Sequence, residues 1–93
     1  MKLHVTSDAV ICFQKEWGFT QGDVVRIFVR YSGMSEEGPY SLGIQHDRPM
    51  YIGLSTIQDN MTFYMEENDV WFLDGRDLTI DSNGEDILFL LPK

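Results

Sequence analysis

The stretch that decides the fold is Val24–Ile44, VVRIFVRYSGMSEEGPYSLGI. In its first part, apolar side chains recur at every second position, and a period of two places them on one face of a β-strand. A second run with the same alternation, Tyr40–His46, follows a short connection. The stretch therefore predicts two neighbouring strands. The alternating residues of the first strand are Val25, Ile27, Val29 and Tyr31.

The connection between these two strands is rich in glycine and acidic residues, and its centre is the predicted functional site. A methionine flanked by glycine suits a soft, adaptable contact. We therefore expect the loop Ser32–Tyr40 to face a protein partner or a ligand. The residues assigned to this site are Arg30, Ser32, Gly33, Met34 and Ser35.

Length and charge limit the classes of function. The 93 residues, 43% of them hydrophobic, suffice for a single domain over residues 1–93 with its own core. The net charge of −8 repels nucleic-acid phosphates and anionic lipid head groups, so we expect neither nucleic acid nor membrane as a partner. One cysteine cannot form an internal disulfide, and the first residues lack an apolar signal segment, which favours a cytoplasmic protein.

The rest of the chain is expected to form short elements separated by turn residues. Residues 1–5 predict an edge strand, and Thr6 or Ser7 is expected to cap a helix that runs to about Trp17. The sum is an α+β domain, mostly β, with about six strands in mixed or antiparallel sheets, one N-terminal helix and one short helical turn. The remaining expected elements are strands at Tyr51–Ile57, Met61–Glu66, Leu78–Asp81 and Ile87–Leu91 and a helical turn at Val70–Leu73.

Two segments resemble a known family. RIFVRYSGMS, residues 26–35, resembles the strand and loop of HesB/IscA-type (A-type) iron–sulfur cluster carriers, where an Arg-x-x-x-Arg strand leads into a Ser-Gly-Cys-Ser-Gly loop. VWFLDGRDLTI, residues 70–80, resembles the family's later Leu-Asp-Gly segment. The chain looks closest to a cysteine-lacking, YneR-like branch. The resemblance implies a HesB/IscA-like fold and a link to iron–sulfur cluster biogenesis.

The ligands of that family are missing from this sequence. The carriers use three cysteines, whereas Met34 occupies the loop position here and the chain ends at about the point where the cysteine-bearing tail would begin. Iron–sulfur clusters are held by thiolates, and a thioether is a poor substitute. We therefore expect no cofactor and no metal.

The remaining candidate ligands are one thiol and two histidines. Cys12 lies on the predicted helix, off its apolar stripe, and is expected to pack as a small hydrophobic residue. The alternative for Cys12 is a cluster shared across an oligomer. His4 and His46 lack a metal-binding spacing, and the sequence has no catalytic triad, nucleotide-binding glycine loop or paired catalytic carboxylates, so we expect no enzyme activity. The apolar stripe consists of Ala9, Val10, Phe13 and Trp17.

Two arginines interrupt the first long strand. Arg26 and Arg30 share one face with Phe28, and like charges on an apolar face need acidic partners or water. We expect a structural role, with Asp74 or Glu66 as partners. The alternative is one edge of a site for an anion or an acidic partner, because the planar guanidinium suits a carboxylate.

Three functions remain open at this point. The first is a non-catalytic HesB/IscA-like protein that serves iron–sulfur cluster biogenesis by docking to a partner. The second is a metal-independent protein- or ligand-binding or regulatory module that uses the Ser32–Tyr40 loop. The third is an iron or cluster binder that uses Cys12 across an oligomer.

Overall fold

A computed structural model describes residues 1–35 and 38–92. It confirms an α+β domain that is mostly β, with seven strands instead of about six in the described ranges. In chain order the elements are β1 (Leu3–Val5), α1 (Ser7–Lys15), β2 (Val24–Ser35), β3 (Gly38–His46), β4 (Ile52–Gln58), β5 (Met61–Glu66), the 3-10 turn η1 (Val70–Leu73), β6 (Leu78–Ser82) and β7 (Ile87–Leu90).

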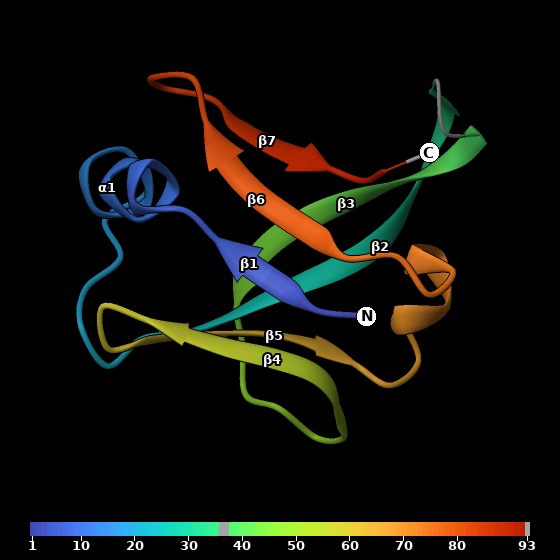
Figure 1. Cartoon of the computed structure of the whole chain (residues 1–93), viewed down its shortest axis with the longest axis horizontal. Helices are drawn as coiled ribbons and strands as arrows, with labels where there is room; N and C mark the ends of the chain where they lie inside the picture. Colours follow the sequence, from blue (N-terminus) through green and yellow to red (C-terminus); the bar gives the residue numbers. More distant parts are fainter. Residues whose placement is uncertain (36–37, 93) are drawn as a thin grey trace.

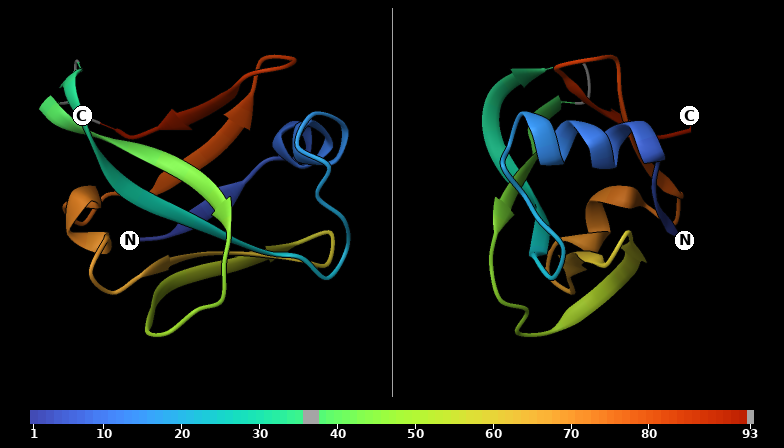
Figure 2. Two further views of the ribbon diagram at one scale, coloured as in Figure 1. Left: turned by 180° about the vertical axis from the view of Figure 1, so that it is seen from behind. Right: turned by 90° about the vertical axis from the view of Figure 1, so that its left-hand side faces the viewer.

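The strands form two mixed sheets (Figure 1). The smaller sheet has the order β1-β6-β7, with β1 parallel to β6 and β6 antiparallel to β7. The larger sheet has the order β3-β2-β5-β4, in which only the β2–β5 pair is parallel. The two sheets lie against each other, with α1 at one side and η1 at the other (Figures 1 and 2).

The core lies between the two sheets and is closed at one side by α1. Phe13 of α1 is fully buried, and its ring lies 5.5 Å from Phe63, 5.6 Å from Phe19 and 5.5 Å from Trp17. The expected alternation in β2 holds for Val25 and Ile27, which are fully buried. Burial of such side chains is the main stabilising term for a small domain.

The predicted local signals agree with the helix and the turns. Thr6 caps α1, because its hydroxyl accepts a hydrogen bond of 3.1 Å from the Ala9 amide. Asp59 and Asn60 adopt positive φ angles between β4 and β5, as a tight hairpin turn requires. η1 ends with Asp74 and Gly75 both in the left-handed region, a conformation that glycine adopts without steric strain at a helix end.

The end of β2 differs from the sequence-based expectation. Residues Ser32–Ser35 belong to β2, so the expected loop centre is strand. Pairing with β3 is interrupted after Tyr31↔Tyr40 and resumes at Ser35↔Gly38, and Gly33 adopts a φ of 90° within this irregularity. A bulge of this kind lets a strand continue where regular pairing breaks, which the Gly-rich sequence alone does not distinguish from a loop.

Gly53 permits a close approach of the segment before η1 to β4. A Cβ atom at Gly53 would lie 2.9 Å from Glu67 Cα and 2.9 Å from Val70 Cγ1. Glu67 Cα belongs to the backbone and cannot turn aside as a side chain would. We expect Gly53→Ala to lower the free energy of unfolding by about 1–3 kcal/mol, measured by urea denaturation. Ser55→Ala in the same strand is the control, and equal losses in both variants would contradict this reading.

Candidate protein-binding site

Three exposed aromatic side chains form a continuous surface, which we call the aromatic strip: Tyr31, Tyr40 and Trp71. The rings of Tyr31 and Tyr40 are 5.8 Å apart, and those of Tyr40 and Trp71 are 5.4 Å apart, both edge to face. Tyr31 is 74% exposed, Trp71 56% and Tyr40 38%. Contiguous exposed aromatic residues are typical of protein-binding surfaces, because each ring supplies a large contact area at low cost in side-chain entropy.

The strip joins two parts of the chain that are distant in sequence. Tyr31 and Tyr40 are directly opposite each other on β2 and β3, at the last regular pair before the irregularity. Trp71 lies on η1, which is near this end of the β2–β3 hairpin (Figure 1). The ring of Phe72, 5.9 Å from Trp71, continues the aromatic contacts towards the core.

Arg76 holds η1 in place. Its guanidinium donates hydrogen bonds of 2.7 Å to the Leu73 carbonyl, 3.2 Å to the Phe72 carbonyl and 3.3 Å to the Pro92 carbonyl. The Leu73 and Phe72 carbonyls lie at the end of the turn, where backbone acceptors lack partners within it, and the Pro92 carbonyl belongs to the segment after β7. The base of Trp71 is therefore fixed, and the strip is a preorganised surface.

A partly buried ion pair links η1 to β2. Arg26 donates to Asp69, directly before η1, at 3.0 Å and to Asp47 at 3.4 Å. Burial lowers the pKa of Arg26, but its hydrogen bonds to Asp69 and Asp47 outweigh this effect and raise it. Arg26 thus pairs with carboxylates, as expected for a structural role, but its hydrogen bonds go to Asp69 and Asp47 instead of the suggested Asp74 or Glu66.

Glu66 stabilises the connection between β3 and β4. Its carboxylate accepts hydrogen bonds of 2.8 Å from the Met50 amide and 2.7 Å from the Tyr51 amide. These bonds, Met50 first, hold the pKa of Glu66 below its usual range.

The lowered pKa of Glu66 predicts how stability responds to acid. A carboxyl whose pKa is lower in the folded chain than in the unfolded chain stabilises the fold at pH values above its unfolded-state pKa of about 4.3. This contribution is lost as the pH falls through the folded-state pKa. We expect the midpoint of urea denaturation to be lower for Glu66→Gln than for the wild type at about pH 7. The difference between the two midpoints should become smaller below about pH 4. A gap independent of pH would contradict this role. Glu67→Gln, a neighbouring exposed carboxylate, is the control.

Of the predicted site residues, the structure describes the side chain of Arg30, which lies apart from the aromatic strip. Arg30 is exposed, and its Nε donates to Ser41 Oγ at 3.3 Å rather than to a carboxylate. Strand alternation places Arg30 and Tyr31 on opposite faces of β2. Gly33 lies in the β2 irregularity. The side chains of Ser32, Met34 and Ser35, and residues 36–37, lie outside the described part of the structure, so their role stays a prediction.

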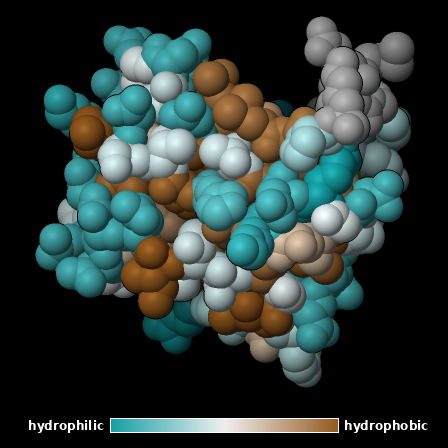
Figure 3. All heavy atoms as spheres, viewed as in Figure 1, coloured by the Kyte–Doolittle hydropathy of each residue, from teal (hydrophilic) through white to brown (hydrophobic). Residues whose placement is uncertain are grey.

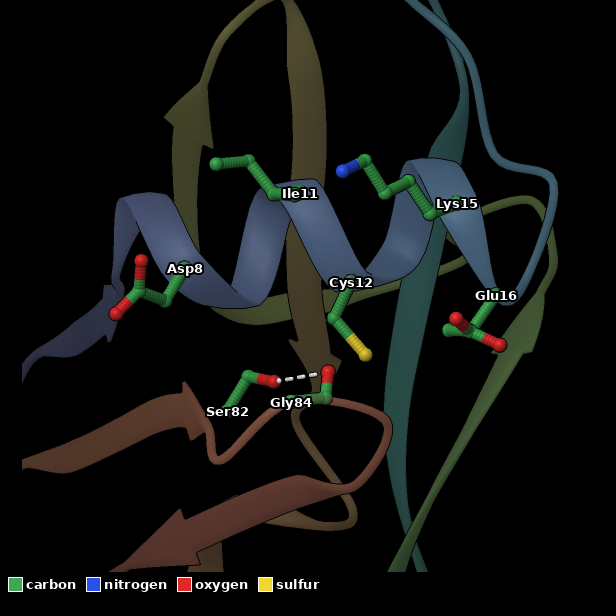
Figure 4. A pocket seen from close by; sticks show the side chains of 7 residues that line it. All are labelled: Asp8, Ile11, Cys12, Lys15, Glu16, Ser82 and Gly84. Atoms are coloured by element: carbon green, nitrogen blue, oxygen red, sulfur yellow. Dashed lines mark hydrogen bonds between the residues drawn. The ribbon is translucent and has the colours of Figure 1, made fainter.

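Cys12 is more buried than the sequence pattern indicates. It is 3% exposed, and its Sγ lies 3.4 Å from the Glu85 carbonyl oxygen in the connection between β6 and β7, whereas Ala9, Val10 and Phe13 of the expected stripe pack into the core. It lines a shallow hollow of about 360 Å³, where the thiol points towards Ser82 at the end of β6 and Gly84 in the loop that follows (Figure 4). Its surroundings fit the expected packing role.

The histidines have ordinary surroundings. His46 Nε2 lies 3.1 Å from Asp23 Oδ2, and its ring lies 4.2 Å from that of Phe19. His4 is exposed on β1. Within residues 1–35 and 38–92, no three His, Cys, Asp or Glu side chains gather in a way that could hold a metal ion. In the same ranges, every helix is too short or too polar to cross a membrane.

Comparison with known proteins overturns the family suggested by the sequence motifs. No family model matches the chain. Over 81 residues the chain is 38% identical to a Bacillus subtilis protein named pyruvate dehydrogenase inhibitor, covering 86% of this chain and 85% of that protein. It is also 26% identical over 87 residues to an uncharacterized protein of Staphylococcus saprophyticus, covering 89% of each.

The identification as a HesB/IscA-type carrier is therefore wrong, and so is its link to iron–sulfur cluster biogenesis. The resemblance rested on short motifs, chiefly the Arg-x-x-x-Arg strand and the Leu-Asp-Gly segment. In this structure Arg26 serves an ion pair and Asp74-Gly75 ends a 3-10 turn, which are structural tasks that unrelated folds also need. An identity of 38% across most of both chains carries more weight: the chain belongs to the family of the Bacillus subtilis protein named pyruvate dehydrogenase inhibitor.

Proposed function

We propose that this chain is a non-catalytic, protein-binding inhibitor of pyruvate dehydrogenase and that it docks through the aromatic strip. The observation that carries the proposal is the 38% identity, over 86% of the chain, to the Bacillus subtilis protein named pyruvate dehydrogenase inhibitor. This replaces the iron–sulfur reading with the second of the three functions left open by the sequence, a binding or regulatory module.

The physical character of the strip supports a protein partner. Binding energy at protein interfaces is concentrated in a few aromatic or arginine side chains near the centre of the contact. Tyr31 and Trp71 are mostly exposed in the free chain, so a partner would bury a large apolar area on them.

Non-catalytic inhibition fits the chemistry of the described residues. The Arg26–Asp69 ion pair and the His46–Asp23 contact engage groups of the protein itself. An inhibitor of this kind acts by covering or distorting a surface of the enzyme, which needs affinity and shape but no reactive group.

The test is a titration of pyruvate dehydrogenase from the same organism with the purified chain. We expect a saturable fall in the rate of pyruvate oxidation and co-elution of the chain with the enzyme in gel filtration. A small acidic protein of similar charge is the control, since the net charge of −8 alone can cause weak, salt-sensitive association. Unchanged enzyme activity at a large molar excess of the chain would refute the proposal.

A further inference from the structure

A groove of about 410 Å³ runs between the free edges of the two sheets. It is lined by β3, the edge strand of the larger sheet, and β7, the edge strand of the smaller sheet, together with Phe28 and Arg30 of β2 and with Trp17. β7 starts at the α1 side of the molecule and runs towards the hairpin end of β3 (Figure 1). The residues that line the groove do not include those of the aromatic strip. What binds in the groove is therefore independent of which enzyme the strip contacts.

The groove exposes side chains that belong to the inner faces of the sheets. Ile44 of β3 lies opposite Ile27, which is fully buried, yet Ile44 and Leu42 are only half-buried. Ile87 and Phe89 of β7 are half-buried on the other wall. Apolar side chains reach the surface along β7 (Figure 3). The seam between the sheets is therefore a place where further apolar burial would stabilise a complex.

The outer edge of β3 along residues 42–44, which line the groove, offers a backbone template. In the described ranges β3 pairs with β2 on one side only. The outer edge of such a strand presents N–H and C=O groups that an extended peptide can pair with, while its alternate side chains enter an adjacent pocket. Here that pocket is the apolar groove.

Charged residues at the two ends of the groove limit which segment can bind in it. Arg30 of β2 lines the groove near the hairpin end, and Asp86, directly before β7, lines it near α1. Both side chains are exposed. A second copy of the chain is disfavoured, because each copy carries a net charge of −8.

We infer that this groove binds an extended segment of another protein, apolar at alternate positions, that adds as a strand antiparallel to β3. Antiparallel pairing is slightly more stable per residue than parallel pairing. β3 runs from the hairpin end towards α1, so the added segment starts beside Asp86 and ends beside Arg30. Its first residue is basic and its last residue is acidic.

The test uses tryptophan fluorescence. The chain has two tryptophans, and Trp17 lines the groove whereas Trp71 does not. In a Trp71→Phe background, Trp17 reports occupation of the groove. The probes are the peptide Lys-Val-Thr-Val-Thr-Val-Glu and its reverse, Glu-Val-Thr-Val-Thr-Val-Lys. We expect a saturable change in Trp17 emission, with tighter binding of the first peptide.

Charge reversal at the rim makes the test specific. Arg30→Glu should weaken the first peptide about fivefold, the effect of a single exposed charge pair, and strengthen the reverse peptide. Arg48→Glu, on the exposed connection after β3, should change neither affinity. No change in emission with either peptide would overturn the inference, and so would equal responses of the two arginine variants. A stable dimer of the free chain that shields Trp17 would also overturn it, because a second copy would then be the occupant.

Discussion

Replacing Phe13 with alanine is expected to lower the free energy of unfolding by about 3–5 kcal/mol. Phe13 is fully buried, and three aromatic rings surround it within 5.6 Å, centroid to centroid. Truncation removes the apolar contacts of the ring and leaves a cavity that rigid neighbours cannot fill. A small domain has only about 5–15 kcal/mol of stability in total, so this one change should remove a large share. Urea denaturation followed by circular dichroism measures the loss.

Phe28→Ala is the matched control for this prediction. Phe28 is half-buried on the outer face of β2, where its ring lies over Gly43, so its truncation should cost about 1 kcal/mol. The same side chain is thus removed from two environments. Similar losses in both variants would show that Phe13 does not lie at the centre of the core.

Sequence reasoning predicts most of the fold, because local signals and tertiary packing agree. The alternation in β2, the Thr6 cap and the Asp59-Asn60 turn each depend on a few neighbouring residues, and each appears in the structure. The number of strands and the end of β2 were less predictable. A glycine-rich segment is compatible with a loop or with a bulged strand, and pairing with β3 decides between them.

The aromatic strip was not predicted, because it depends on tertiary structure. Alternation assigns Tyr31 to the same face as the buried Ile27, but the hairpin extends past the core and leaves Tyr31 exposed. Trp71 lies in an apolar turn that sequence patterns assign to the interior. Its approach to Tyr40 follows from the Arg26–Asp69 link between residues 43 positions apart. The only sequence signal available was the presence of three aromatic residues near polar or glycine-rich connections.

The resemblance in short motifs shows a second limit of prediction from sequence. Short patterns such as Arg-x-x-x-Arg describe strand geometry and local ion pairs, and these recur for structural reasons. A pattern of this kind predicts local structure better than it predicts a family. Identity spread over most of both chains samples the core, the turns and the surface together, and it places this chain in the family of the Bacillus subtilis protein named pyruvate dehydrogenase inhibitor.

The central claim is that Trp71 is an anchor of an inhibitory contact. We expect Trp71→Ala to raise the concentration for half-maximal inhibition of pyruvate dehydrogenase roughly 30-fold or more, because loss of a central aromatic residue commonly costs about 2 kcal/mol or more of binding energy. Trp71 is mostly exposed, so its variant should denature at nearly the wild-type midpoint. Tyr31→Ala should act in the same direction.

The most direct measurement titrates the enzyme in parallel with the wild type, Trp71→Ala and Ile57→Ala. Ile57 is 69% exposed near the end of β4, and this end of the strand, unlike its start, is remote from η1 (Figure 1). It therefore controls for the removal of an exposed apolar side chain. The account predicts that the wild type and Ile57→Ala inhibit alike while Trp71→Ala requires a far higher concentration. Equal inhibition by all three proteins, or none by the wild type, would contradict it.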